Sequence, residues 1–252
     1  METLKTISTL QETKKAESFT AFENLYLQVR EKEKRINTDE ETAMLPSVSS
    51  QHLYFKEWKL RGYSFKKLVQ YLKNKNRLLN ILEVGCGNGW LSAGLAATVP
   101  GTITGIDINS SELEQAKRVF GEKENLKFLQ GDIQNQFLPD NFFDIIVFAA
   151  SVQYFPSLKR IIQTAQQHLH PVGEIHILDS PFYKRSELEG AKDRTRKHYS
   201  SLGFSEMSSY YFHHCIDELK NFKYEILYNP DSLFNKFRRI KNPFYMIKII
   251  QS

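Results

Sequence analysis

LEVGCGNGWLS, residues 82–92, is the most informative segment of this sequence. It closes a short apolar run, and its glycines at positions 85, 87 and 89 predict a buried strand that enters a tight turn before a helix. At such a turn the backbone can approach a ligand closely, and the helix N-terminus offers unpaired N–H groups. The segment therefore predicts a ligand site at a strand-to-helix turn, although a purely structural turn would use the same glycines.

Strands and helices alternate along the rest of the chain. The predicted strands are residues 78–84, 102–108, 125–132, 142–150, 174–180, 223–229 and 243–250. The predicted helices are residues 90–99, 110–120 and 157–169, with Ser110 or Ser111 as an N-cap and turn residues at 170–173. Such alternation is typical of parallel strands with right-handed crossovers, and a late pair of strands adds an antiparallel edge. We therefore predict an α/β fold with a Rossmann-like, doubly wound, seven-stranded sheet, mostly parallel with an antiparallel last strand, preceded by an N-terminal helical extension.

Two details narrow the ligand. A dinucleotide-binding turn has the spacing GxGxxG, whereas this turn has GxGxG and places Trp90 where the third glycine would stand. Asp107 ends the second strand 20 residues after Gly87, the distance at which an acid meets ribose hydroxyls. Asp107 alone would also suit a helix cap. Together the two features favour a nucleoside ligand without a pyrophosphate and disfavour NAD.

These motifs resemble those of the class I S-adenosylmethionine-dependent methyltransferases. The run EVGCGNG followed by GID is similar to the first two motifs of that family, and QGD at residues 130–132 is similar to the third. Residues 142–155, FFDIIVFAASVQYF, resemble the fourth, and residues 169–180 resemble the helix-turn-strand that follows. The resemblance covers residues 78–180 in unbroken order, and it implies both the fold and the cofactor S-adenosylmethionine.

The resemblance also implies where the cofactor is held. The implied contacts are the methionine amino group with Glu83 and Gly85, close backbone approach at Cys86 and Gly87, ribose with Asp107, adenine with Ile108, Asp132 and Ile133, and the methyl group with Ala149 and Ala150. In this reading Cys86 lines the site through its backbone and is not a nucleophile. No metal ligands are expected.

The sequence says less about the methyl acceptor. After the fourth strand the chain has ASVQYF, which lacks the NPPY-type motif of adenine methylation, the cysteine nucleophile of cytosine methylation and the clustered carboxylates of the catechol type. Tyr154 and His198 are the candidate catalytic residues, and Tyr183, His213 and His214 are further candidate bases. Each of them could equally be an ordinary surface or core residue.

The first 75 residues stand apart from these motifs. Two amphipathic stretches are predicted there, one at residues 52–74 and one whose apolar positions recur at steps of three and four, namely Phe19, Phe22, Leu25, Tyr26 and Val29. We divide the chain into an N-terminal helical extension at residues 1–75 and a methyltransferase catalytic domain at residues 76–252. The extension, with Tyr54, Phe55 and Trp58, could form a lid over the site or simply pack at the sheet edge.

The composition of the chain limits the classes of protein to which it can belong. The chain has 252 residues, a net charge of +5 and only two cysteines, and no apolar run is long enough to cross a bilayer. We expect a cytoplasmic protein with no membrane partner. Its function is expected to be methylation of a small-molecule hydroxyl, carboxyl or amine, and the basic segment 184–199 would attract an anionic acceptor. The alternatives are a nucleic-acid or protein methyltransferase, which the net charge favours but the missing motifs disfavour, and a non-catalytic S-adenosylmethionine-binding protein.

Overall fold

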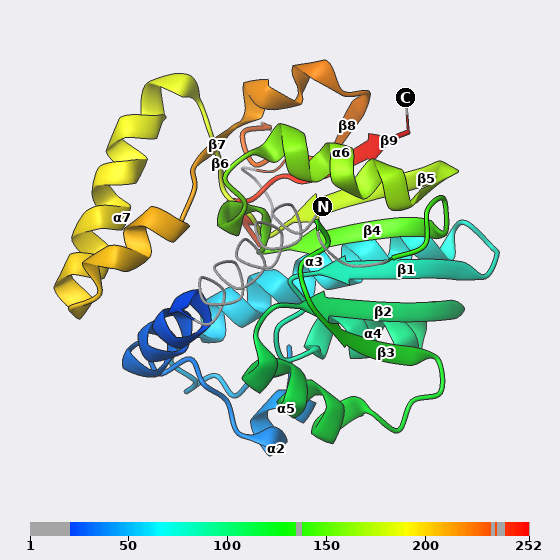
Figure 1. Cartoon of the computed structure of the whole chain (residues 1–252), viewed down its shortest axis with the longest axis horizontal. Coiled ribbons are helices and arrows are strands. Elements are labelled where there is room, and N and C mark those ends of the chain that lie inside the picture. The colour runs from blue at the N-terminus through cyan, green and yellow to red at the C-terminus, as the bar shows by residue number, and fades with distance from the viewer. Residues whose placement is uncertain (1–20, 135–137, 233–234, 236–239, 252) are drawn as a thin grey trace, which may run out of the picture.

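A computed structural model describes residues 21–134, 138–232, 235 and 240–251. Its centre is a seven-stranded sheet in the order β3-β2-β1-β4-β5-β9-β8 (Figure 1). The strands are β1 Leu79–Val84, β2 Gly101–Asp107, β3 Leu126–Gln130, β4 Phe143–Ala149, β5 Leu169–Leu178, β8 Tyr224–Tyr228 and β9 Met246–Ile250. Strand β9 runs antiparallel to both β5 and β8, while the other pairs are parallel. The predicted fold class and the antiparallel last strand are confirmed.

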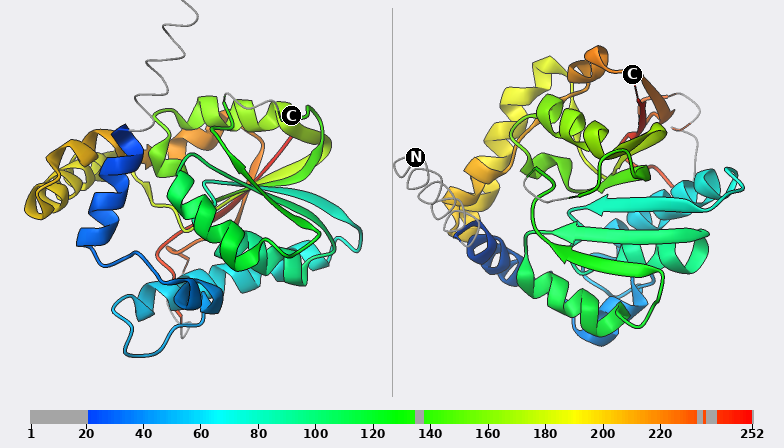
Figure 2. Two further views of the ribbon diagram at one scale, coloured as in Figure 1. Left: turned by 60° about the horizontal axis from the view of Figure 1, so that its bottom comes forward. Right: turned by 45° about the vertical axis from the view of Figure 1, so that its right-hand side comes forward.

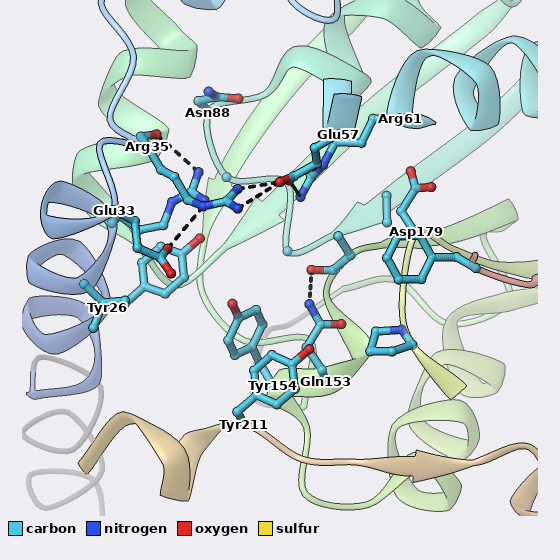
Figure 3. A pocket seen from close by; sticks show the side chains of 18 of the residues that line it. Tyr26, Glu33, Arg35, Glu57, Arg61, Asn88, Gln153, Tyr154, Asp179 and Tyr211 are labelled. Carbon is cyan, nitrogen blue, oxygen red and sulfur yellow. Dashed lines mark hydrogen bonds and ion pairs between the residues drawn. The ribbon is translucent and has the colours of Figure 1, made fainter. Parts of the chain in front are cut away.

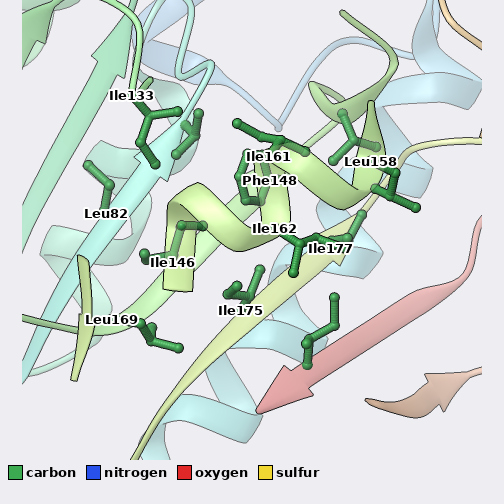
Figure 4. Close-up of a cluster of buried hydrophobic side chains, with 14 of the residues drawn as sticks. Leu82, Ile133, Ile146, Phe148, Leu158, Ile161, Ile162, Leu169, Ile175 and Ile177 are labelled. Atoms are coloured by element: carbon green, nitrogen blue, oxygen red, sulfur yellow. The ribbon is translucent and has the colours of Figure 1, made fainter. Parts of the chain in front are cut away.

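The central strands are apolar on both faces because helices cover both. On one face α6, Leu158–His168, packs Ile161 and Ile162 against Phe148 of β4 (Figure 4). On the other face α3, Phe55–Lys73, and α4, Trp90–Thr98, pack against Val147 of the same strand. Neighbouring residues of β4 thus belong to opposite cores, as the alternation of a strand requires.

The helix predicted at residues 110–120 is present, but its N-cap is a different residue from the one expected. Helix α5 spans Ser110–Phe120, and its N-cap is Asn109, whose side chain accepts from the Glu112 N–H. The prediction of Ser110 or Ser111 as N-cap was therefore wrong. Asn is as good a cap as Ser, so the serines take the first helical positions instead.

The turn expected at residues 170–173 is also corrected. These residues belong to β5, which begins at Leu169 and pairs with Phe143 of β4. The pairing shifts register between Phe143 and Ile145, so the extra residues are absorbed by an irregularity of the ladder. Proline and glycine fit there because this end of the strand is exposed, with Val172 at 71% exposure.

A cap stands over the carboxyl ends of the central strands. It consists of the helical residues 21–32 and of α7, Leu188–Leu202, which lie side by side at one end of the sheet (Figures 1 and 2). Val29 and Tyr199 belong to one buried cluster that joins these two helices. Phe19 of the predicted amphipathic stretch lies outside the described residues.

Smaller elements complete the described chain. They are α2 Asp39–Met44, the two-stranded sheet of β6 Phe182–Tyr183 and β7 His214–Cys215, and the 3-10 turns η1 Val152–Tyr154, η2 Arg185–Glu187, η3 Ser205–Tyr210 and η4 Ile216–Asn221. In the described ranges, no helix has the length and apolarity that a bilayer span needs.

Candidate active site

Two adjoining cavities lie at the carboxyl ends of the central strands, under the cap. The larger has a volume of about 590 Å³ and the smaller about 270 Å³. Residues that line both are Tyr26, Gly85, Gly87, Glu112, Ala150 and Tyr154. The cavities therefore meet at the glycine turn, which is where the sequence predicted a ligand.

The glycine turn leaves no room for side chains. Gly85 and Gly87 have φ of +74° and +51°, values that L side chains rarely adopt. A Cβ on Gly85 would lie 2.6 Å from the Cβ of Ser151, and the Ser151 hydroxyl donates to the Val84 carbonyl over 2.7 Å. The turn after β1 is thus fixed against the segment that follows β4, and the cavity wall between them is backbone.

Asp107 stands between the glycine turn and the smaller cavity. Its two carboxylate oxygens accept from the N–H groups of Gly87, over 2.7 Å, and Asn109, over 2.8 Å. Burial raises the pKa of Asp107, while these backbone donors act to lower it. Two bonds leave lone pairs free on the carboxylate, so Asp107 can still accept from a ligand hydroxyl.

The remaining predicted adenosine contacts line the same small cavity. They are Ile108, Asp132 and Ile133, with Ile133 almost fully buried in the core. Phe22 and Tyr26 of the N-terminal helical residues face them across the cavity. The structure therefore brings together residues that the sequence placed in three separate motifs.

The larger cavity contains two ionisable side chains suited to an α-amino acid, those of Glu83 and Arg30. Glu83 is 2% exposed and accepts a hydrogen bond from the Ser92 hydroxyl, and burial raises the pKa of its carboxyl to about 8. Within the described residues, the buried Nε of Arg30 has no hydrogen-bond partner, and its Nη2 reaches only the Arg35 carbonyl at 3.4 Å. A buried carboxyl and an unsatisfied guanidinium are complementary to an ammonium and a carboxylate, so the methionine end of S-adenosylmethionine fits these residues.

Trp90 fills the place that a dinucleotide-binding turn gives to its third glycine. The indole is 8% exposed and packs edge-on against Trp58 at 5.5 Å and Phe65 at 6.0 Å between ring centroids. It also lines the larger cavity. Close packing of α4 on a pyrophosphate is therefore not available at this turn.

An ion-pair cluster braces the wall formed by α3. Glu57 pairs with Arg35 over 2.8 Å and with Arg61 over 3.0 Å, and Glu33 pairs with Arg35 over 3.2 Å (Figure 3). Since these charges neutralise each other, they shape the cavity more than they attract a ligand. The guanidinium of Arg30 takes no part in these ion pairs.

The predicted catalytic candidates fall in different places. Tyr154 lines both cavities, and Tyr183 lines the larger one. His198 does not line either cavity: its side chain is 52% exposed and pairs with Glu33 over 2.8 Å. His213 contacts the Thr195 hydroxyl, and His214 is buried against the Val152 carbonyl.

Several cavity residues, Arg30 among them, were not singled out from the sequence. Glu112, in the first turn of α5, faces Gly87, and burial raises the pKa of its carboxyl to about 7. Gln153 and Asp179 follow β4 and β5, and both line the larger cavity (Figure 3). Polar residues just after two adjacent parallel strands were a usable signal for the last two, because such strands end at one edge.

Ala150 and Asp179 adopt a conformation unusual for residues other than glycine. Their φ values are +55° and +54°, and they follow the paired residues Ala149 and Leu178. The Ala150 N–H donates to the Leu178 carbonyl over 2.9 Å, which holds the two strand ends together. Strained backbone at adjacent strand ends is typical of functional sites.

Comparisons with known proteins agree with this architecture. Residues 82–177 match the family model of the methyltransferase domain. The chain is 26% identical over 160 residues to a sterol 24-C-methyltransferase of Gibberella zeae, a match that covers 61% of this chain and 41% of the relative. It is 32% identical over 124 residues to a malonyl-acyl-carrier-protein O-methyltransferase of Ilyobacter polytropus, covering 49% and 47% respectively. The chain therefore spans less than half the length of these curated relatives.

Solved structures share the fold. A geranyl diphosphate C-methyltransferase from Streptomyces coelicolor has a TM-score of 0.57 at 10% identity, covering 81% of this chain and 83% of that one. An S-adenosylmethionine-dependent methyltransferase from Mesorhizobium loti has a TM-score of 0.54 at 15% identity, covering 76% and 99%. At these identities the structures show a shared fold, and the match of residues 82–177 to the methyltransferase domain agrees with the family that the motifs resemble.

Proposed function

We propose that this chain, a member of the class I S-adenosylmethionine-dependent methyltransferases, transfers the methyl group to a small acceptor bound in the larger cavity. One observation carries the proposal: two cavities of different chemistry meet at the glycine turn. The smaller is lined by the residues suited to adenosine, and the larger has room for both the methionine end and an acceptor.

The residues that would hold the cofactor are those of the motifs. Asp107 would accept the ribose hydroxyls, Asp132 with Ile108 and Ile133 would hold adenine, and Glu83 would pair with the methionine ammonium. Gly85, Gly87 and the Cys86 backbone would let the chain lie close, with Ala149 beside the methyl group. Burial raises the pKa of the Cys86 thiol, so it stays protonated and inert. When bound, S-adenosylmethionine supplies a sulfonium methyl group that needs no acid to leave.

The chain's own contribution is alignment and exclusion of water. Tyr26 meets Tyr154 edge-on at 5.8 Å, and Tyr154 meets Tyr211 at 6.0 Å, so aromatic rings from three elements close over the site. We propose that the N-terminal extension of residues 1–75 provides the lid of a catalytic domain at residues 76–252 through its helical residues 21–32, while its helix α3 packs on the sheet. Because burial raises the pKa of Tyr154, its phenol would be a packing and hydrogen-bonding contact rather than a base.

Support for a small acceptor comes from the volume of the larger cavity, about 590 Å³, and from the relatives, whose names include a sterol and a fatty-acid methyltransferase. Methylation of a polymer would call for an open groove with a continuous basic track. We further propose a cytoplasmic setting, in keeping with two buried cysteines, Cys86 and Cys215, that are both free thiols.

The proposal is tested by offering ¹³C-methyl-labelled S-adenosylmethionine with pooled small metabolites, with RNA and with folded proteins. We expect label and S-adenosylhomocysteine to appear with the metabolites. Transfer confined to RNA or protein would overturn the acceptor class. Binding of S-adenosylhomocysteine without transfer to any of the three would favour the non-catalytic alternative.

A further inference from the structure

The larger cavity contains one buried polar atom that the chain itself does not satisfy. Gln153 is 7% exposed, and its Nε2 donates to the Ala150 carbonyl over 2.6 Å (Figure 3). That bond fixes the orientation of the amide, because a carbonyl can only accept. The other atom, Oε1, is buried and has no hydrogen-bond partner among the described residues. A buried acceptor without a hydrogen bond costs free energy of folding, so we expect a donor group of the ligand to lie there.

A carboxylate belongs to the same part of the cavity. Asp179 follows β5 as Ala150 follows β4, and these strands are paired up to Ala149 and Leu178. Its Oδ1 accepts from the Ser64 hydroxyl over 2.6 Å, and Ser64 accepts in turn from Asn242 over 2.8 Å. This chain of bonds fixes the carboxylate at the cavity wall. Within the described residues, no cation is ion-paired with it.

Resting on the proposed function, we infer that the acceptor presents a hydroxyl or an amine, which donates to Gln153 Oε1 and gives a proton to Asp179. An amine has a separate N–H for each of the two acceptors, whereas a hydroxyl donates its one proton to Gln153 Oε1 when bound and passes the same proton to Asp179 as the methyl group is transferred. A carboxylate acceptor has no proton to donate to Gln153 Oε1 at neutral pH, and its charge would be repelled by that of Asp179. A carbon nucleophile itself offers no N–H or O–H to Gln153 Oε1. The site thus selects among the three acceptor classes open from the sequence.

The methyl transfer can be followed bond by bond. The lone pair of the acceptor oxygen, or of the nitrogen of an amine in its neutral form, forms the bond to the methyl carbon while the carbon–sulfur bond breaks toward sulfur, leaving a thioether. The acceptor then carries one proton too many, and this proton passes to the Asp179 carboxylate. Burial raises the pKa of Asp179 to about 6, which leaves the group mostly ionised near pH 7 and able to take a proton.

The test uses three probes on one aromatic scaffold, which suits the tyrosine-lined wall: 2-phenylethanol, 2-phenylethylamine and phenylacetate. Ligand-observed NMR on the cofactor-free full chain measures binding, and release of S-adenosylhomocysteine measures turnover. We expect the alcohol or the amine to bind and react in preference to phenylacetate. Preference for phenylacetate in both measurements would overturn the inference, and so would the lack of turnover of any alcohol or amine by protein that binds S-adenosylhomocysteine.

A pair of variants checks that Gln153 is the contact. Gln153→Met keeps the length of the side chain and removes Oε1, and Gln163→Met is the matched control on the exposed side of α6. We expect Gln153→Met to weaken probe binding by about tenfold, as loss of one hydrogen bond to a buried group predicts, with S-adenosylhomocysteine affinity unchanged. Unchanged probe binding would overturn the contact. If the unsubstituted chain does not bind S-adenosylhomocysteine, the proposed function itself is wrong.

Discussion

The two cavities share the glycine turn but differ in what their walls leave unsatisfied. The smaller cavity has an anchored acid, Asp107, whose oxygens already accept from two backbone N–H groups. The larger cavity has buried groups with spare capacity, among them Arg30 Nε and Gln153 Oε1. A wall whose polar groups are already fixed is preorganised for one ligand, whereas spare donors and acceptors wait for partners. The difference indicates that the boundary between cofactor and acceptor recognition lies inside the larger cavity, where Arg30 suits the methionine carboxylate and Gln153 suits the acceptor.

The strongest test of this division is Asp179→Asn. Loss of a general base costs roughly 10²- to 10⁴-fold in rate, so kcat should fall by at least about 100-fold. Affinity for S-adenosylhomocysteine should stay within about twofold, because Asp179 belongs to the acceptor side. Stopped-flow or steady-state kinetics with the preferred probe measures the first quantity, and calorimetry measures the second. Equal losses of kcat and of affinity for S-adenosylhomocysteine would contradict the assignment of Asp179 to the acceptor.

The same variant has a predicted effect on stability. The pKa of Asp179 in the folded protein, about 6, lies above the ordinary carboxyl value, so stability falls as pH rises through this window. Asparagine has no proton to lose. At pH 8 the melting temperature of Asp179→Asn should therefore equal or exceed that of the parent, which separates loss of activity from loss of fold.

On the cofactor side, Asp107→Ala should weaken S-adenosylhomocysteine binding by roughly 1.5–3 kcal/mol, or about 10- to 150-fold, the worth of hydrogen bonds to a charged group. Asp193→Ala, an exposed aspartate of α7 paired with Arg196, is the matched control and should change affinity by less than about twofold. Calorimetry decides between them. Unchanged affinity in Asp107→Ala would remove the ribose assignment.

The residues proposed to hold the cofactor could be located from the sequence more readily than those proposed to hold the acceptor, for a physical reason. A glycine turn and an acid 20 residues later are local patterns, and parallel strand pairing brings them together automatically. Arg30, Gln153 and Asp179 come from distant parts of the chain, and their meaning depends on which neighbours they lack. His198 shows the converse, since a plausible base in the sequence lies outside the cavity, paired with Glu33.

The pH dependence of kcat should also report on Asp179, with a smaller effect than its substitution. Asp179 acts as a base only when ionised, so kcat should fall about tenfold per pH unit below about 6 and level off above it. Arg61, Ser64 and Asn242 lower this pKa, whereas burial and Glu57 raise it. The role of Asp179 as the base would be contradicted if kcat of the parent did not fall below about pH 6, or if the same fall persisted in Asp179→Asn.

The smallest expected effect belongs to His198→Gln. The pair of His198 with Glu33 joins α7 to the segment after the N-terminal helical residues, and a half-exposed pair contributes at most about 1 kcal/mol. We expect kcat within about twofold of the parent and a slightly lower melting temperature. A loss of kcat above tenfold would return His198 to the list of catalytic candidates.

The central claim, that the two cavities hold S-adenosylmethionine, is tested most directly by calorimetric titration of the full chain with S-adenosylhomocysteine and, separately, with NAD. Asp107, Glu83 and the glycine turn with Trp90 predict single-site binding of S-adenosylhomocysteine and no heat of binding from NAD. Binding of NAD without binding of S-adenosylhomocysteine would contradict the cofactor, the family role of the glycine turn and the division of the site between its two cavities.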